Sequence, residues 1–256
     1  MQKLLVSLLF YALASSVFAI PSRSLQSLVP TQTFTFPKFT PLPQEILNGL
    51  TPVSAGGYGG NKRIGELIYL GKPHTLPALR VSRNEIKTCY LQNDNVIVKN
   101  ANTNKIINFR CEKQDPTHNN LYWDAYLGKV NHGYSPENDT LYAADVTTNM
   151  FLDWYKTPPY HDEHGLIKPA TFYLHLNIDN ANYETDGASI GDGNSMFYPL
   201  ASLETISFFM GALFTNQNSN LNWGASQSGG INIAFSCMTA MAAEFYATGK
   251  NTWQVG

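Results

Sequence analysis

The chain has 256 residues, of which 43% are hydrophobic and only 14% are charged, and its formal net charge at pH 7 is −2. This length suits one large domain or two small ones, and the apolar content is enough for a sizeable core. The charge balance lacks the basic excess that binding to nucleic acid or to an anionic membrane surface requires, so we predict neither partner.

The N-terminus has the form of a secretory signal peptide. Lys3 supplies the positive start, Leu4 to Ala14 form an apolar run, and Val17-Phe18-Ala19 is a small-x-small cleavage site. We predict a signal peptide over residues 1–19, cleavage after Ala19 and a secreted protein, extracellular or periplasmic. The apolar run is shorter than the roughly 20 residues of a membrane span, which argues against an anchor.

Residues 20–54 are rich in Pro, Ser, Thr and Leu, a composition that predicts an irregular leader or linker. A glycine-rich run, Gly56 to Gly60, follows. It is no phosphate loop, because neither Lys-Ser nor Lys-Thr comes after it. Residues 65–110 alternate as β-strands separated by Asn and Asp turns.

A long helix is predicted from Pro136 to Trp154 or Tyr155. Ser135 is a favourable N-cap and proline suits the first helical position. Pro158-Pro159 ends the helix.

The next segment, Tyr160 to His164, contains two histidines and two acidic residues. A metal site is one reading of it. A solvated polar loop is favoured, because no further ligand is fixed near His161 and His164.

Three more elements follow in the C-terminal half. Thr171 to Ile178 reads as a strand. A helix from about Ala201 to Thr215 is apolar on nearly every face, which is typical of a fully buried helix. A last helix is predicted from about Ile231 to Ala247.

Two motifs in these helices carry a family resemblance. Ser207 to Leu221 reads SFFMGALFTNQNSNL, and Ser228 to Ser236 reads SGGINIAFS. They resemble the zinc helix of the thermolysin-like neutral metallopeptidases, H-E-x-x-H followed by G-F-T-E-Q-N-S in the vibriolysin and pseudolysin branch, and the downstream S-G-G-x-N-E-A-F-S of that family. Gly56 to Gly65 and Gly191 to Leu200 resemble two further blocks.

The resemblance covers residues 55–256 and implies a bacterial extracellular protein. It implies an α+β fold, the β-rich N-terminal lobe of a thermolysin-like metallopeptidase with about three helices. Because the chain ends at Gly256, we expect the family's C-terminal helical lobe to be absent.

The zinc chemistry of the family has no counterpart in these motifs. The positions of the two metal histidines fall on Phe208 and Ala212, that of the third ligand on Ile233, and that of the catalytic glutamate on Phe209. None of these side chains offers a lone pair to zinc or accepts a proton from a bound water. The family's tyrosine donor falls on Trp223, whose indole N–H replaces a phenol only in part. We therefore predict no zinc cofactor and no catalytic residue.

Other roles are carried over by resemblance alone. The strand Thr171 to Ile178 is expected to edge the substrate cleft, and Asn180 and Ala181 are expected to hydrogen-bond the backbone of a bound peptide. A disulfide between Cys89 and Cys111 is expected from the matching positions of pseudolysin-like relatives.

The resemblance also marks a calcium site. Glu204 and Glu244 stand at its positions, whereas Cys237, Met241 and Thr252 replace other acids of the cluster. Two glutamates make a poor calcium cage, so ordinary helix or surface glutamates are the favoured reading. Cys237 itself is predicted to be a buried free thiol rather than a nucleophile.

Three functional readings follow. The first is a secreted, catalytically inactive homologue that binds a peptide or protein, the second an active secreted zinc metalloendopeptidase, and the third an unstable product of a truncated gene. Because the helix from Ala201 to Thr215 is so apolar, we also predict that its side bearing Phe208, Ala212 and Thr215 is covered. Self-association or a partner protein is the first candidate, and the leader, through Phe34, Phe36 and Phe39, is the second.

Overall fold

A computed structural model of the chain describes residues 49–111, 121–122, 130–194, 196–221 and 226–253. All of them belong to one compact unit, Lys38–Gly256. The predicted signal peptide, residues 20–48 of the predicted leader, and Trp223 lie outside the described residues.

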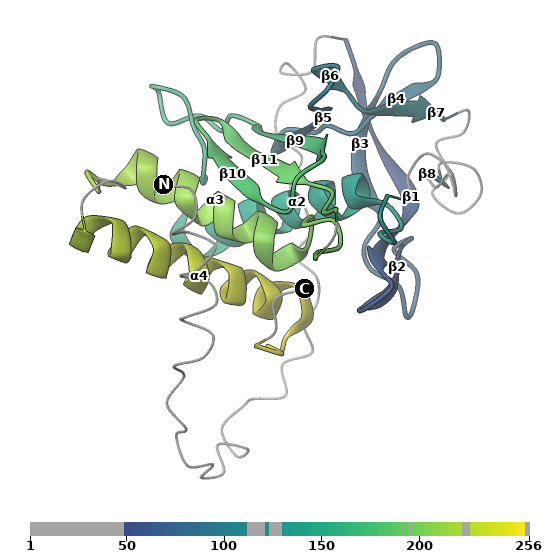
Figure 1. Cartoon of the computed structure of the whole chain (residues 1–256). Coiled ribbons are helices and arrows are strands. Elements are labelled where there is room, and N and C mark those ends of the chain that lie inside the picture. The colour runs from purple at the N-terminus through teal and green to yellow at the C-terminus, as the bar shows by residue number, and fades with distance from the viewer. Residues whose placement is uncertain (1–48, 112–120, 123–129, 195, 222–225, 254–256) are drawn as a thin grey trace. The chain divides into compact units, whose positions relative to one another are not determined.

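The first sheet is organised by the long strand β1 (Thr51–Asn61). The strand order is β2-β1-β3-β4-β7, with β8 (Leu121–Tyr122) parallel to β1 (Figure 1). The second half of β1 pairs antiparallel with β2 and its first half with β3. The other strands of this sheet are β2 (Gly65–Tyr69), β3 (Leu79–Arg83), β4 (Thr88–Tyr90) and β7 (Asn108–Arg110).

The start of β1 corrects the predicted end of the leader. Residues 51–54 are not irregular, because Thr51 pairs with Arg83 and the ladder continues to Ala55 opposite Leu79. The local composition around Pro52 is typical of a linker. Pairing with a strand about 30 residues away overrides that local signal.

The second sheet has the order β10-β11-β9-β5-β6. Its strands are β5 (Val96–Asn100), β6 (Lys105–Ile106), β9 (Ala170–Leu176), β10 (Ala181–Glu184) and β11 (Gly187–Gly191). Strand β9 runs parallel to both β11 and β5, so it lies inside the sheet. That this strand borders a substrate cleft stays a prediction. One edge of the sheet is β10, which turns back antiparallel to β11.

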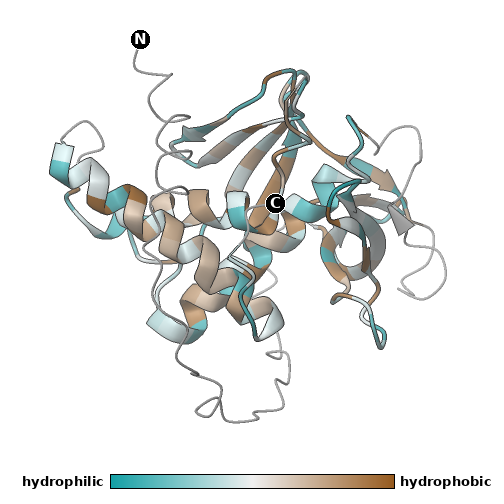
Figure 2. Ribbon diagram, turned by 60° about the horizontal axis from the view of Figure 1, so that its bottom comes forward, coloured by the Kyte–Doolittle hydropathy of each residue, from teal (hydrophilic) through white to brown (hydrophobic). Residues whose placement is uncertain are grey.

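Three helices are present among the described residues: α2 (Pro136–Tyr155), α3 (Leu203–Asn218) and α4 (Ser226–Thr248). With the two sheets they form the predicted α+β fold. Figure 2 shows α3 and α4 coloured largely apolar, while polar colour gathers in loops and at helix ends. No described helix combines the length and apolarity needed to cross a membrane.

The boundaries of α2 were predicted correctly, and those of α4 were not. Helix α4 begins at Ser226, five residues before the predicted start. The added turn contains Gly229 and Gly230, which are poor helix formers. The turn is helical although local propensity disfavours it.

The disulfide expected from the family resemblance is confirmed. Cys89 on β4 is bonded to Cys111, which follows β7, with Cα atoms 5.7 Å apart. The bond ties together two strands that already pair in the first sheet. Cys237 is a free, half-buried thiol on α4, and burial raises its pKa.

Candidate functional site

Helices α3 and α4 pack closely along the segment that carries the zinc-type motif. Ser202 caps α3, accepting a hydrogen bond from Thr205 N at 3.2 Å. A Cβ at Gly211 would lie 2.6 Å from Thr239 Oγ1 on α4, so glycine permits the close approach. Thr215 Oγ1 donates to Asn232 Oδ1 across the same contact. The absence of a side chain at Gly211 and the hydrogen bond from Thr215 to Asn232 therefore both contribute to the close packing of the two helices.

The positions predicted to replace the zinc ligands and the catalytic glutamate lie on these two helices. Phe208 and Phe209 are each 7% exposed, and their rings meet edge to face with centroids 5.4 Å apart. Ala212 is fully buried, and Ile233 on α4 packs against the core. These four side chains are hydrocarbon, which has no hydrogen-bonding group that needs a partner.

The zinc implied by the resemblance does not fit these residues. Zinc sites in proteins are built from Cys, His, Asp or Glu ligands. In the part of the chain that the structure describes, no group of three or more such residues could hold a metal ion. The donor set needed for the family's metal chemistry is lacking here.

The side of α3 expected to need cover is already buried. Phe208 and Thr215 are 7% and 6% exposed, and Ala212 is inaccessible to solvent. Part of this burial comes from α4, which meets α3 at Gly211 and Thr215. A second copy is thus not required to cover this face. Self-association and the leader contact stay predictions.

Strand β10 forms the edge beside the residues expected to bind a peptide. Gly191 N donates to Asn180 O at 3.0 Å, which turns the backbone of Asn180 toward β11. Backbone groups alternate along a strand, so Ala181 and Tyr183 present their N–H and C=O groups outward. Ser189 Oγ donates to Glu184 Oε1 at 2.6 Å and ties β10 to its neighbour. The peptide-binding role of Asn180 and Ala181 stays a prediction.

A half-buried histidine held between two carboxylates lies at the end of β9. His175 Nε2 is 3.1 Å from Glu137 Oε1, and its Nδ1 is 3.2 Å from Asp192 Oδ2. Burial lowers the pKa of His175, but hydrogen bonds to Asp192 and Glu137 outweigh it and raise the pKa to about 10. The ring is an imidazolium that donates to both carboxylates. It links the start of α2, the end of β9 and the residue that follows β11. At neutral pH neither ring nitrogen can accept a proton.

A second buried carboxylate, Asp139, lies two residues after Glu137 on α2. Asp139 accepts hydrogen bonds from Gly60 N at 2.8 Å and Tyr69 Oη at 2.5 Å. Burial raises the pKa of Asp139 to about 7, although these hydrogen bonds lower it. A Cβ at Gly59 would lie 1.9 Å from Asp139 Oδ1. The glycine-rich run thus lets β1 pass against the start of α2.

The calcium implied by the resemblance does not fit either. Glu204 and Glu244 line one cavity, so the fold brings the two predicted residues together. Glu244 accepts from Thr252 N at 3.0 Å and Thr252 Oγ1 at 2.7 Å. Calcium takes six to eight oxygen ligands, whereas these positions offer two carboxylates, one already hydrogen-bonded.

The segment from Tyr160 to His164 is a loop tied to α3. Gln217 Oε1 accepts from His161 N at 2.7 Å, and Gln217 Nε2 donates to His161 O at 3.0 Å. His164 is exposed and lies 3.6 Å from exposed Glu163. This agrees with the favoured reading of a polar loop.

Sequence reasoning did not find the centre around His175. Its three members, Glu137, His175 and Asp192, are separated by 38 and 17 residues. No local motif spans such distances. The sequence places acidic residues in the first turn of the predicted helix, and the structure shows that this turn is buried.

Comparison with known proteins places these observations in context. Residues 71–215 match the family model described as thermolysin metallopeptidase, catalytic domain. The zinc metalloproteinase of Legionella pneumophila is 36% identical over 213 residues, which are 78% of this chain and 38% of that protein. The neutral protease of Vibrio proteolyticus is 32% identical over 215 residues, 82% of this chain and 33% of that protein.

A solved structure shows a weaker similarity. The precursor of protealysin, a metalloproteinase from Serratia proteamaculans, has a TM-score of 0.47 and 19% identity, covering 64% of this chain and 49% of that one. The chain spans between 33% and 38% of the length of the two curated relatives named above.

Proposed function

The chain belongs to the thermolysin metallopeptidase family, and from this premise we propose that it is a secreted, catalytically inactive member that binds a peptide or protein at strand β10. Its α+β fold is that of the family's β-rich N-terminal lobe. Peptidase activity would need a metal and a proton acceptor. The proposal therefore separates the family's scaffold from its chemistry.

One observation carries the inactivity. Phe208, Phe209 and Ala212 on α3 are buried and Ile233 on α4 packs against the core, so hydrocarbon stands where a peptidase would need imidazole and carboxylate. Zinc cannot be held without such donors. Without zinc, no water is activated for attack on a peptide bond.

The binding role is supported by the open edge of the second sheet. An extended peptide adds to such an edge through main-chain hydrogen bonds, here with Ala181 and Tyr183. The neighbouring loop is anchored by Asn194 N, which donates to Asp179 Oδ1 at 2.7 Å. Met196 on this loop is 76% exposed and provides apolar surface beside the edge.

Secretion is supported by two independent features. The N-terminal pattern ending at Ala19 is that of a signal peptide. The Cys89–Cys111 disulfide is of a kind that persists in oxidising compartments.

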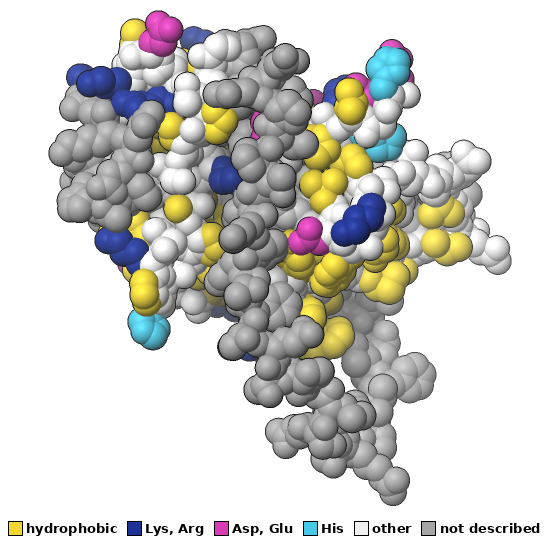
Figure 3. Space-filling view, turned by 180° about the vertical axis from the view of Figure 1, so that it is seen from behind, with side chains coloured by type: hydrophobic (Ala, Val, Ile, Leu, Met, Phe, Trp, Pro, Cys, Tyr) yellow, Lys and Arg dark blue, Asp and Glu magenta, His cyan; other side chains and the backbone are white. Residues whose placement is uncertain are grey.

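Self-association is a further part of this proposal. Large apolar side chains are exposed on α4, with Ile231 and Met238 at 58% and 61%. Trp154 and Tyr155, at the end of α2, are 46% and 50% exposed. The rear view in Figure 3 shows hydrophobic side chains gathered on the helical side of the chain. Sedimentation velocity at micromolar concentration tests for a dimer, and a monomer throughout would contradict it.

The central experiment tests one preparation both for zinc-dependent cleavage and for peptide binding. The purified mature chain is assayed for bound zinc and for cleavage of casein, with a zinc metalloproteinase of the family as positive control. It is also immobilised and presented with a tryptic digest of casein. We expect no stoichiometric zinc, no cleavage and retention of some peptides.

A variant pair locates the binding. Ala181→Pro removes one outward N–H, whereas Ala181→Gly keeps it, so only the proline variant should release the peptides. One tightly held zinc per chain, or chelator-sensitive cleavage, would favour the zinc endopeptidase instead. Lack of a cooperative thermal transition would favour an unstable gene product.

A further inference from the structure

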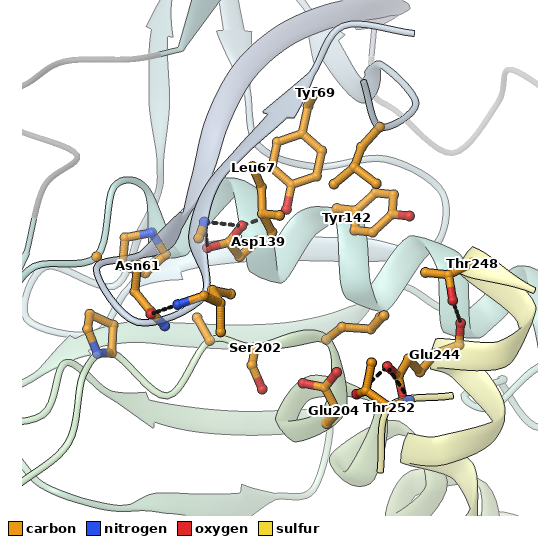
Figure 4. A pocket seen from close by; sticks show the side chains of 18 residues that line it. Asn61, Leu67, Tyr69, Asp139, Tyr142, Ser202, Glu204, Glu244, Thr248 and Thr252 are labelled. Atoms are coloured by element: carbon orange, nitrogen blue, oxygen red, sulfur yellow. Dashed lines mark hydrogen bonds between the residues drawn. The ribbon is translucent and has the colours of Figure 1, made fainter. Parts of the chain in front are cut away.

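A cavity of about 320 Å³ lies away from strand β10 (Figure 4). Its walls come from the β1–β2 hairpin, the start of α2, the N-terminal end of α3 and the C-terminal end of α4. This volume falls within the range of small-molecule sites, roughly 300–1,000 Å³. Counting about 30 Å³ for each water-sized unit, the space suits a ligand of about ten non-hydrogen atoms.

The cavity has an apolar wall and a buried floor. Ile64, Leu67, Leu76 and Leu203 supply hydrocarbon around it. Ile64 is 47% exposed and marks the mouth, whereas Tyr69 is 1% exposed and belongs to the floor. An apolar ligand body would therefore be taken out of water as it enters.

All the formal charges that line the cavity are negative. They are Asp139, Glu204 and Glu244, and no described Lys, Arg or His lines it. Figure 4 shows Glu204 and Glu244 close to each other, with Asp139 across the cavity. Two helix ends of opposite polarity meet here, the N-terminus of α3 and the C-terminus of α4, so their dipoles offset and the carboxylates set the sign of the potential.

Only one of these carboxylates is free to take a new partner. Asp139 is held by Gly60 N and Tyr69 Oη. Glu244 is held by Thr252 N and Oγ1. The carboxylate of Glu204 makes no hydrogen bond or ion pair with any residue that the structure describes. A half-buried carboxylate beside apolar walls is stabilised by an opposite charge within about 4 Å.

We propose that this cavity binds a small organic cation, a primary ammonium group on an apolar body of about ten non-hydrogen atoms. The ammonium pairs with Glu204, and the body packs between Ile64, Leu67 and Leu203. A bare calcium ion would be coordinated too sparsely, since one free carboxylate falls far short of six ligands. This site is separate from β10 and does not depend on the proposed peptide binding.

The test compares two probes that differ in charge and little in shape. 2-Phenylethylammonium and neutral 2-phenylethanol are titrated into the mature chain and followed by the amide resonances of Ile64, Leu67 and Thr252. We expect saturable shifts at these residues with the ammonium and at least tenfold weaker binding of the alcohol. Equal affinity for the two probes, or no saturable shift with the ammonium, overturns the proposal.

Variants distinguish a site that recognises the charge of the probe from an apolar surface that binds both probes alike. Glu204→Gln keeps the shape and removes the charge, so the ammonium should bind about tenfold more weakly and the alcohol unchanged. Ile64→Ala shortens the apolar wall at the exposed mouth and should weaken both probes. Glu163→Gln, in an exposed loop outside the cavity, is the matched control and should change neither.

Calcium distinguishes the remaining alternative. Calcium chloride added to the ammonium complex should leave the shifted resonances in place. Displacement of the probe at submillimolar calcium would identify a metal site and overturn the proposal. Retention of full ammonium affinity by folded Glu204→Gln, judged by its circular dichroism spectrum, would overturn it as well.

Discussion

The start of α2 and the Phe208–Phe209 pair on α3 bury side chains of opposite kinds. At the start of α2, Glu137 and Asp139 are 1% and 9% exposed, and each has hydrogen-bonding partners from other elements. On α3, Phe208 and Phe209 are buried to a similar degree and carry no charge.

The difference concerns what holds each region together. Buried charges are tolerated only when they are paired and hydrogen-bonded, and removing one partner leaves an uncompensated charge. A hydrocarbon contact needs no such partners but rejects any charge placed in it. The two regions should therefore respond in opposite ways to substitutions that add or remove ionisable groups.

The largest effect is expected from placing a charge in the hydrocarbon contact. Phe209→Glu should lower the free energy of unfolding by about 3–5 kcal/mol at pH 8, because the carboxylate is buried without a partner. Phe209→Leu is the matched control and should cost less than about 1.5 kcal/mol. Urea unfolding measures both, and a glutamate no more costly than leucine would contradict a closed apolar contact.

Removing the imidazolium of His175, which contacts Glu137 at the start of α2, should lower the free energy of unfolding by nearly as much. His175→Gln leaves Glu137 and Asp192 close together without a cation, at about 3 kcal/mol. The pKa of His175 is about 10 when folded against 6.5 ordinarily. Its stabilisation is therefore fully present below pH 6.5 and is lost as pH rises through 10.

The pH dependence distinguishes this role from simple packing. Unfolding measured from pH 6 to 10 should show a decline in the stability of the native chain that the variant lacks. Parallel curves for the two proteins would mean that His175 is not held as a cation.

A smaller effect is expected at Asp139. Its pKa is raised to about 7 from 3.8 by burial, so the folded chain holds this proton more tightly than the unfolded chain. The stability contributed is fully present below pH 3.8 and is lost as pH rises through 7. Asp139→Asn should remove this slope while costing about 1–2 kcal/mol, since one of the hydrogen bonds from Gly60 and Tyr69 is weakened. Guanidinium unfolding between pH 4 and 7.5 tests this, and an unchanged slope would reject it.

The smallest effect is expected from metal ions. Since neither the α3–α4 contact nor the cavity with Glu204 offers a metal site, the midpoint of thermal unfolding should not move with EDTA, zinc or calcium. Differential scanning calorimetry measures it, with a zinc metalloproteinase of the family as positive control. A rise on adding zinc or calcium would show a site that the described residues do not reveal.

Local signals predicted the parts of the fold that local physics decides. Ser135 and Pro136 marked the start of α2, and the all-round apolar character of α3 predicted its burial. Ser135 nevertheless does not cap the helix with its side chain. Its Oγ donates to Glu137 Oε2 at 3.1 Å, because the buried carboxylate competes for it.

Features that depend on distant partners were predicted poorly. Residues 51–54 were predicted to belong to an irregular linker, yet they pair with β3. Nothing local to β9 predicted that it would be central in its sheet, with β11 and β5 both running beside it. Pairing between segments far apart in the chain leaves no trace in either segment alone.

The sequence by itself determined the family, the disulfide pair and the loss of metal-binding side chains, because each depends on which residues stand at motif positions. Only the tertiary structure decided that α4 covers part of α3, that β10 is an edge of the second sheet, and that His175 meets Glu137 and Asp192. It also brought Glu204 and Glu244 into one cavity. These are matters of spatial proximity, which follow from how strands and helices stack and not from any local run of residues.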